Sequence, residues 1–466
     1  MDKMDNQTIM QDKAELNAAW DTLIAELQSA RQAIDDPALF PPEASSRVLA
    51  EGYRYLAGFL HHGVERTFHE DADFPVFRNA LSVINKSTIE NPDAIYFYAP
   101  IDGRQQYEVT AQLDNFDHWQ GKPRTTDQAL APQYLIFEVA DGPMSGDTGE
   151  LTELAKGFRT SFGRLDNADL IVSDEGELRI LLGPEKPAGY KGNFICTRKP
   201  PNQYSKDGLD RFATYISGRQ LFYDWENEQS VALSITSINH IGQHPAPLTP
   251  AKTADHLRRM GAIIRGQMHF WLNFYDKVLN VHGSHGQPED GRFFFPINGY
   301  NRPNAASGDT GGGMSTNVYA GGMYELADDE ALYIEATYTG SPIYVSVHLG
   351  NLWGESPDYT NHQSSLNLFQ MYMGDDHVQR WIVSHHDPGI QNWLDTTGLP
   401  KGFLSHRWAY SEIPPESEWP IIEAKKIKLS DVDRYIPADM PRLSKAERAQ
   451  AIAIRQAHVQ RRYRSF

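Results

Sequence analysis

The spacing of apolar residues changes three times along this chain, and each change predicts a different kind of element. Residues 12–35, and again the residues after Ser45 and Ser46, carry apolar side chains at helical intervals. The apolar positions are Leu16, Trp20, Leu23, Ile24, Leu27 and Ile34, then Leu49, Tyr53, Leu56, Leu60, Val64 and Phe68. Pro37, Pro41 and Pro42 separate the two series, and Ser45 or Ser46 can cap the second helix. We therefore predict an N-terminal helical hairpin within residues 1–75.

From about Asn91 to Ile238 the apolar period changes to two residues, which indicates β-strands. The run AIYFYAPIDGRQQYEVTAQL predicts a strand, a turn at Asp102-Gly103 and a second strand. Further short runs follow at the spacing that is typical of a sandwich or barrel: QYLIFEVA, ADLIVSD, ELRILLG and SVALSITSI. We expect a first β-sandwich domain over residues 90–240.

The second half of the chain repeats this alternation of helical and strand patterns. Residues 250–285 return to helical spacing and predict a helical linker. Residues 290–410 again read as strands, so we expect a second, jelly-roll-like β domain and a mainly β fold with helical additions. The extension 411–466 is proline-rich up to about Pro420 and ends in the basic helix KAERAQAIAIRQAHVQRRYRSF. That helix suits docking on an acidic surface or on a neighbouring subunit, which leaves a homodimer open. No repeat of 20 to 50 residues is visible.

Composition narrows the class of protein. The chain has 466 residues, 40% of them hydrophobic, which is typical of a globular protein with more than one core. A net charge of −18 argues against nucleic-acid and anionic-membrane partners, which need a basic surface. There is neither a signal-peptide pattern nor a run of about 18 apolar residues, so we expect a cytoplasmic protein without a membrane span. The single cysteine, Cys196, allows no internal disulfide.

Candidate chemistry gathers at the strand ends of the second β domain. Tyr344, Ser346 and His348 alternate with apolar residues, so this polar set either faces solvent or lines a wet cavity. In the following loop Glu355 stands two residues after Trp353, and an indole beside a carboxylate raises the carboxylate pKa toward neutrality. His362 adds an imidazole that titrates in the physiological range.

Other polar runs give weaker indications. Ser384, His385, His386 and Asp387 are neighbours in sequence, whereas hydrolytic triads are assembled from distant positions, so we expect one of the two histidines to face a cleft instead. The glycine-rich segment 298–313 lacks the P-loop pattern, and its Arg302 could bind a carboxylate, phosphate or sulfate group. Because the motifs HExxH, spaced HxH…Glu and paired cysteines are absent, we predict no metal site.

Several segments together resemble the bacterial domain of unknown function 1214 family in its long, stand-alone form. They are GGMYELADDEALYIEA, HLGNLWGESPDYTNHQSSLN, VSHHDPGIQNWLDTTG, the pair Arg407-Trp408 and the tail RQAHVQRRYR, with EGYRYLAGFLHHGVERTF, PDAIYFYAPIDGRQQYEV and LFYDWENE in the first half. The resemblance covers most of residues 45–466 and implies β-sandwich, jelly-roll-like domains. The genomic settings of the family imply hydroxylated hydrophobic ring substrates. Leu399 stands where many members have histidine.

These observations lead to a hypothesis for function. We expect a cofactor-independent lyase or hydrolase that acts by acid/base chemistry on a bulky apolar alcohol or its phosphate or sulfate ester, such as a steroid or isoprenoid. The candidate catalytic residues are Glu355, His362, His348 and His386. The candidate substrate-binding residues, several of them implied by the resemblance, are Tyr300, Arg302, Trp353, Tyr359, Asn367, Asp387, Asn392, Trp393 and Arg407. Two alternatives remain: a non-catalytic protein that binds a glycan or lipid, and a metal-dependent enzyme.

Overall fold

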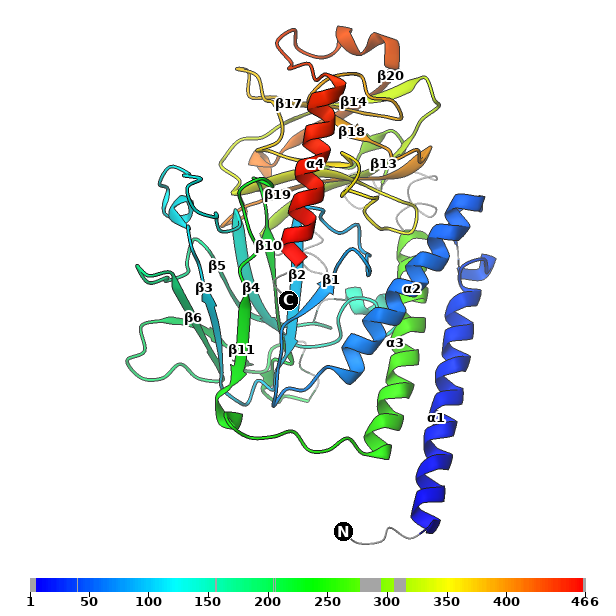
Figure 1. Cartoon of the computed structure of the whole chain (residues 1–466), viewed down its shortest axis with the longest axis vertical. Helices are drawn as coiled ribbons and strands as arrows, with labels where there is room; N and C mark the ends of the chain where they lie inside the picture. Colours follow the sequence, from blue (N-terminus) through cyan, green and yellow to red (C-terminus); the bar gives the residue numbers. More distant parts are fainter. Residues whose placement is uncertain are drawn as a thin grey trace.

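The computed structural model describes residues 6–39, 41–155, 157–203, 205, 207–276, 295–305 and 316–463. Two β-sandwiches lie one above the other in Figure 1, with three long helices along one side and a fourth helix lying against both sandwiches. This is the mainly β fold with helical additions that the sequence predicts. In the described residues no helix is long and apolar enough to cross a membrane.

The first sandwich packs a five-stranded sheet against a four-stranded sheet. The five strands, in spatial order, are β1 (Arg78–Leu81), β2 (Ala94–Pro100), β10 (Tyr215–Leu221), β4 (Tyr134–Ala140) and β5 (Ser161–Asp166). The other sheet has β11 (Leu233–Ser237), β3 (Tyr107–Gln112), β6 (Glu177–Gly183) and β7 (Asn193–Cys196), while β8 (Arg198–Lys199) and β9 (Arg211–Phe212) form a separate pair. Apolar side chains such as Phe97, Phe137, Val109 and Ile180 fill the space between the two sheets.

The second sandwich has the same topology as the first. Its five-stranded sheet consists of β12 (Gly299–Tyr300), β13 (Asn317–Glu325), β19 (Lys401–Ala409), β15 (Tyr344–Gly350) and β16 (Ser365–Asn367). Its four-stranded sheet consists of β20 (Ile421–Lys428), β14 (Glu330–Thr337), β17 (Gln379–Ser384) and β18 (Trp393–Asp395). Each strand of the second sandwich has a counterpart in the first that comes at the same point in chain order and at the same place in its sheet. The parallel strand pair β6–β7 of the first sandwich corresponds to the parallel pair β17–β18 of the second. The chain is therefore an internal duplication.

Side-chain contacts support the duplication. Asn193 accepts the backbone N–H of Ile171 and donates to the carbonyl oxygens of Ile171 and Arg179, at 2.7–2.8 Å. Asn392 makes the corresponding three bonds in the second sandwich, at 2.6–2.8 Å. Both side chains fasten a loop to the strand beside it. Asn392 was predicted from the sequence to bind substrate. Its side chain is instead occupied by hydrogen bonds to the backbone of Tyr372 and Arg380.

In the described part of the chain the α-helices are α1 (Asn6–Gln32), α2 (Ser46–Phe68), α3 (Pro250–Asp276) and α4 (Lys445–Arg462). Ser45 caps α2, since its hydroxyl accepts a hydrogen bond from the backbone N–H of Val48. Helix α3 begins at Pro250, and proline suits the first helical position because no hydrogen bond from its nitrogen is needed there. A capping box of Ser444 and Glu447 starts α4. The helical segments predicted from spacing are confirmed as far as the described residues reach.

The buried face of α2 differs from the predicted one. Tyr53, at 51% exposure, lies on the solvent side together with Leu49, Leu60 and Val64, whereas Gly52, Tyr55, Phe59 and Gly63 are buried. The reason is close packing: a Cβ at Gly52 would come within 2.5 Å of Trp353, so only glycine admits the indole there. Likewise Trp20 and Ile24 of α1 are exposed, while the small residues Ala19 and Ala30 face inward.

Three further differences concern connections. The turn at residues 102–103 carries the chain from one sheet to the facing sheet of the same sandwich, so the two strands that it joins do not pair as a hairpin. Strand β20 completes the second sandwich, which therefore extends beyond residue 410. Helix α4 docks on its own chain: Arg448 meets Asp387 of the second sandwich and Arg462 donates to Pro92 beside the first. The predicted docking on a neighbouring subunit is therefore not needed to bury this helix.

Candidate functional site

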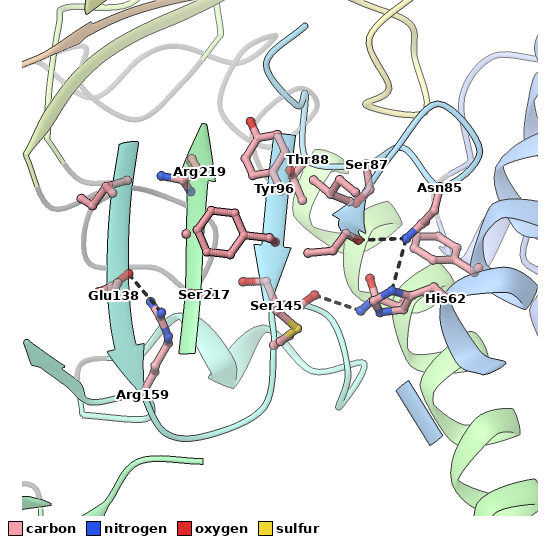
Figure 2. A pocket seen from close by; sticks show the side chains of 18 residues that line it. His62, Asn85, Ser87, Thr88, Tyr96, Glu138, Ser145, Arg159, Ser217 and Arg219 are labelled. Carbon is pink, nitrogen blue, oxygen red and sulfur yellow. Dashed lines mark hydrogen bonds and ion pairs between the residues drawn. The ribbon is translucent and has the colours of Figure 1, made fainter. Parts of the chain in front are cut away.

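A cavity lies between the outer face of the first five-stranded sheet and helices α2 and α3 (Figure 2). Its floor is formed by Tyr96 of β2, Ser217 and Arg219 of β10, and Ile136 and Glu138 of β4. Its walls are residues of α2 and α3 and the loop that leads into β2, among them Phe59, His62, Gln267, Asn85, Ser87 and Thr88. The cavity thus joins apolar and ionisable groups, which is typical of a small-molecule site.

The floor follows from the strand register. Arg219 stands directly between Tyr96 and Ile136, and Ser217 stands beside Glu138, because alternate residues of paired strands share one face. The Arg219 guanidinium lies 5.3 Å from the centre of the Tyr96 ring. The Nη2 of Arg159 is 3.3 Å from the Glu138 carboxylate. Cationic and anionic side chains therefore lie side by side at the polar end of the cavity.

His62 is the ionisable group on the helical wall. The side-chain amide of Asn85 donates to His62 Nδ1 at 3.2 Å, which places the proton of the neutral ring on Nε2. Nε2 lies 4.0 Å from Asp147 Oδ1. Burial alone would raise the pKa of Asp147, but Arg66 and His62 together lower it to about 2, so this carboxylate is anionic. His62 is thus held between an amide and a fixed negative charge.

The loop that forms one wall is conformationally strained. Thr88 and Ile89 have φ of 66° and 51°, and β-branched residues in this left-handed region cost about 1–3 kcal/mol each. The second sandwich holds the strained backbone in place: the Ile89 N–H donates to Gly354 at 2.7 Å, and the Ile89 carbonyl accepts from His348 at 3.0 Å and from Arg407 at 3.3 Å. Strain of this kind clusters at functional sites, and here it fixes the position of Thr88 in the cavity wall.

Behind this loop, Glu355 belongs to a buried cluster of ionisable groups. Burial raises the pKa of Glu355 to about 7, in the direction that the sequence predicts, although Arg54 Nη2 lies 2.5 Å from its carboxylate and Asn351 donates to it at 2.8 Å. Lys86 donates to the carbonyl oxygens of Ser356 and Pro357, and burial lowers its pKa. Glu355 does not line the cavity described above.

Trp353, Tyr359 and Asn367 join parts of the chain that are distant in sequence. The Trp353 indole donates to the Val48 carbonyl at 2.8 Å and packs on α2. The Tyr359 ring lies under the Lys86 ammonium at 4.6 Å. Asn367 donates to Phe222 and Tyr223 of the first sandwich at 3.1 Å. These contacts within the protein account for the burial of the three side chains, so no bound ligand is needed to explain it.

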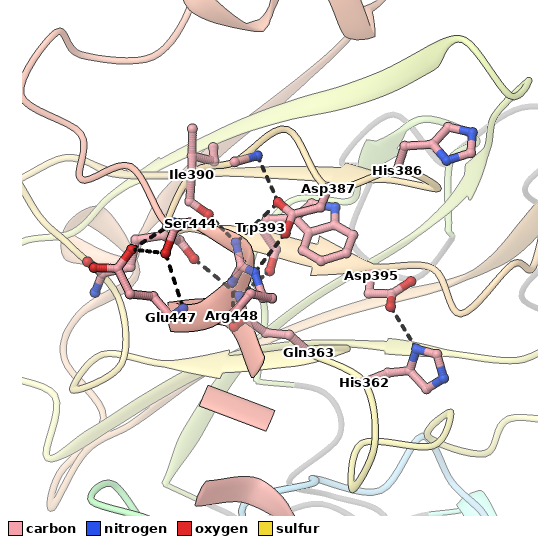
Figure 3. A network of polar contacts seen from close by, with 12 residues as sticks. His362, Gln363, His386, Asp387, Ile390, Trp393, Asp395, Ser444, Glu447 and Arg448 are labelled. Atoms are coloured by element: carbon pink, nitrogen blue, oxygen red, sulfur yellow. Dashed lines mark hydrogen bonds and ion pairs between the residues drawn. The ribbon is translucent and has the colours of Figure 1, made fainter. Parts of the chain in front are cut away.

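Two of the predicted histidines lie at the surface (Figure 3). His362 Nδ1 is 2.7 Å from Asp395, and its side chain is 42% exposed. His386 Nε2 is 2.8 Å from Asp328, with 59% exposure. Neither ring reaches the buried Glu355 through a contact in the described residues, so the structure does not bring the predicted catalytic set together. A catalytic role for them stays a prediction.

The remaining predicted residues divide between helix docking and the surface. In Figure 3 the Asp387 carboxylate binds Arg448 of α4, with Nε at 2.9 Å, and the Trp393 ring lies 5.1 Å from the same guanidinium. Arg302 is half-exposed and forms an ion pair with Glu416 at 3.0 Å. Tyr300 is at least partly buried in β12, while residues 306–313 of the predicted glycine-rich segment lie outside the described residues.

Sequence reasoning missed the residues of the cavity. Ser217 and Arg219 gave a usable signal, since two polar residues spaced by two in the strand YISGRQL must share a face. His62 gave none, because it lies within an ordinary helical pattern. The loop with Asn85 and Thr88 fell in residues 76–89, which no predicted domain included.

In the described residues no group of three or more histidine, cysteine, aspartate or glutamate side chains is arranged to hold a metal ion. No family model and no curated protein matches the chain. Among solved structures, the chain is similar to an uncharacterized protein from Burkholderia cenocepacia, with a TM-score of 0.70 and 24% identity over 90% of this chain and 99% of that one. A protein from Vibrio parahaemolyticus gives a TM-score of 0.39 and 10% identity over 86% of this chain and 100% of that one. The first likeness shows a shared fold.

Proposed function

We propose that this protein is an enzyme that acts on a small molecule in the cavity between α2 and the first sandwich, by acid/base chemistry of the hydrolase or lyase type. The observation that carries the proposal is the composition of the cavity, in which Glu138 and His62 lie on opposite sides of a partly apolar space (Figure 2). Two proton-transfer groups facing one space are what general acid and general base catalysis requires.

Each group has a defined part in this proposal. Phe59, Ile136 and Met144 would bury the apolar body of the substrate. Arg219 would bind an oxygen-bearing or anionic head group, since guanidinium favours carboxylate and phosphate oxygens. Glu138, on the floor, would accept a proton. His62, beside the anionic Asp147, would donate one from its imidazolium form, with the Asn85 side chain turned so that its amide oxygen accepts from Nδ1.

The substrate class rests on the resemblance to the family of unknown function and on the apolar cavity. We infer a bulky hydroxylated apolar molecule or its ester, such as a steroid or isoprenoid. The cavity lies outside the second sandwich, where the sequence analysis placed the catalytic residues. The proposal therefore keeps the predicted reaction class and moves the chemistry to different residues.

A binding protein without catalysis is the second candidate, and one observation favours it. Both proton-transfer groups already have partners, Glu138 with Arg159 at 3.3 Å and His62 with Asn85 at 3.2 Å. Paired groups of this kind fix the shape and polarity of a pocket, and they must exchange partners before they can transfer a proton.

The test is incubation with a panel of steroid and isoprenoid alcohols and their phosphate and sulfate esters. Mass spectrometry reads conversion, and the shift of the melting temperature reads binding. If the natural protein converts a compound and Glu138→Gln lowers the rate at least about 100-fold, the result supports the proposal of an enzyme, since general acid/base groups contribute roughly 10²–10⁴-fold to the rate. Binding without conversion supports the binding protein.

A matched pair of variants locates the ligand. Ser217→Leu places an isobutyl group in the cavity, and we expect ligand affinity to fall about tenfold or more through overpacking and lost space. Ser405 of β19 holds the corresponding place in the second sandwich, opposite Gly321 of β13. Ser405→Leu should leave this affinity unchanged. If both variants bind the ligand as well as the natural protein does, the cavity is not the site.

A further inference from the structure

The duplication repeats part of the cavity floor in the second sandwich. On β10 and β2, Arg219 stands opposite Tyr96 and Ser217 lies two residues along. On β19 and β13, Arg407 stands opposite Tyr319 and Ser405 lies two residues along. The ring contacts are also repeated, since the two guanidinium carbons lie 5.3 Å and 5.6 Å from the centres of their tyrosine rings.

Arg407 is buried in a way that leaves its charge without a carboxylate. Its exposure is 8%, and within the described ranges it forms no ion pair with Asp or Glu. Its Nη2 donates to the Ile89 carbonyl at 3.3 Å and lies 3.4 Å from His348 Nε2. Its Nε is buried and has no hydrogen-bond partner. Burying a cation without an anion is costly, so a buried unpaired guanidinium indicates a missing negative charge.

Other buried arginines of this chain show the contrast. Arg455 and Arg462 of α4 also donate to backbone carbonyl oxygens, but both lie in the field of the buried carboxylate Asp93. Arg448 pairs with Asp387. Arg407 lacks such a carboxylate partner among the residues that the structure describes, and the aromatic ring beside its guanidinium is that of Tyr319.

The neighbours of Arg407 are suited to an oxyanion. Ser346 stands directly opposite Arg407 on β15, and its side chain is buried. His348 is buried two residues along, and burial together with Arg407 lowers its pKa well below the usual value, so this imidazole is neutral. A hydroxyl donor and a guanidinium Nε on the same sheet face form a site for a carboxylate or phosphate group.

We propose that the second sandwich binds an oxyanion, a carboxylate or phosphate group, at Arg407 and Ser346 on the outer face of its five-stranded sheet. This site is distinct from the cavity and does not depend on the proposed reaction there. The anion would supply the negative charge that Arg407 lacks. Because Arg407 also bonds the Ile89 carbonyl, the bound anion would stabilise the strained loop at Thr88 and Ile89.

Inorganic phosphate is the probe for this site. Titration calorimetry at constant ionic strength, with sodium chloride as the reference salt, should show binding to the natural protein. Arg407→Gln should weaken it about tenfold or more, as expected for loss of a charge-assisted hydrogen bond. Arg179→Gln, at an exposed position, should leave it unchanged. Absence of phosphate binding, or equal binding by Arg407→Gln, would overturn the proposal.

Two further measurements keep the test decisive. If Arg407→Gln does not fold, Ser346→Ala should still weaken phosphate binding severalfold, and unchanged binding would count against the site. Arg219→Gln separates the two locations: loss of phosphate binding in this variant alone would place the anion in the cavity. A crystal structure with selenate should show its anomalous signal beside Arg407, and a signal confined to other places would contradict the assignment.

Discussion

The two sandwiches share one strand order, but the outer faces of their five-stranded sheets meet different surroundings. In the first sandwich Ser217 and Glu138 face α2 and α3 across a cavity. In the second, Met323 and Phe403 pack directly against apolar residues of α3, and Arg407 contacts the loop at Ile89. The comparison shows how a duplicated scaffold can keep an open ligand space in one copy and use the same face for domain contacts in the other.

The largest expected effect tests whether the sandwiches are equivalent as folded units. Asn193→Ala and Asn392→Ala should each lower the free energy of unfolding by about 3 kcal/mol, since each removes three hydrogen bonds and leaves buried backbone groups unpaired. Urea denaturation followed by circular dichroism measures the change. Similar losses at the two positions support the duplication, and a loss under 1 kcal/mol at either position would contradict a shared structural role.

A second comparison uses one buried carboxylate from each sandwich. Burial raises the pKa of both Glu228 and Glu355 to about 7, above their ordinary value of 4.5, although Arg124 and Arg54 oppose the shift. The stability that each raised pKa provides is fully present below pH 4.5 and is lost as the pH rises through 7. We therefore expect the free energy of unfolding to fall by roughly 2–3 kcal/mol per group between these values.

Glutamine variants test this pH dependence. Glu228→Gln and Glu355→Gln should each flatten the decline in stability between pH 4.5 and pH 8, as measured by urea denaturation. If Glu355 also transfers protons, only Glu355→Gln should abolish turnover, with Glu228→Gln as its matched control. A decline that is equally steep in the natural protein and in both variants would show that these carboxylates titrate normally.

The smallest effects are expected at His386 and His362 of the second sandwich. His386→Ala should change stability by less than about 0.5 kcal/mol, because its ion pair with Asp328 is exposed, and His362→Ala, whose ion pair with Asp395 is partly buried, by less than about 1 kcal/mol. Both variants should keep full activity on any substrate found for the cavity. A loss of turnover above tenfold in either variant would return the catalytic role to the second sandwich.

Much of the fold could be predicted from the sequence, because local patterns determine local elements. The two-residue period of AIYFYAP and YVSVHLG predicts strands, and capping residues such as Ser45 mark helix starts. Strand β20 was not predicted, because the lysines of its sequence IIEAKKIK resemble those of the basic C-terminal segment. The duplication was not predicted, because the two sandwiches have the same residue type at few corresponding positions, such as Tyr96 and Tyr319. These positions can be matched only when the sheet register is known.

The candidate site could be predicted only in part. The raised pKa of Glu355 follows from burial, which the neighbouring Trp353 suggests, yet the sequence does not show that this carboxylate lies behind a loop and away from the cavity. The cavity is built by helices α2 and α3, the loop before β2 and strands of the first five-stranded sheet, which are far apart in the chain. His62 and Glu138 each look ordinary in their own element, and only tertiary packing places them around one space.

The most direct test of the account is a crystal structure of the protein with whichever steroid, isoprenoid or ester binds most tightly in the panel. We expect its electron density between α2 and β10, with the apolar body beside Phe59 and the polar head within hydrogen-bond distance of Arg219. Density in any other place, such as beside the exposed His362, with the cavity empty, would contradict the assignment of the cavity as the functional site.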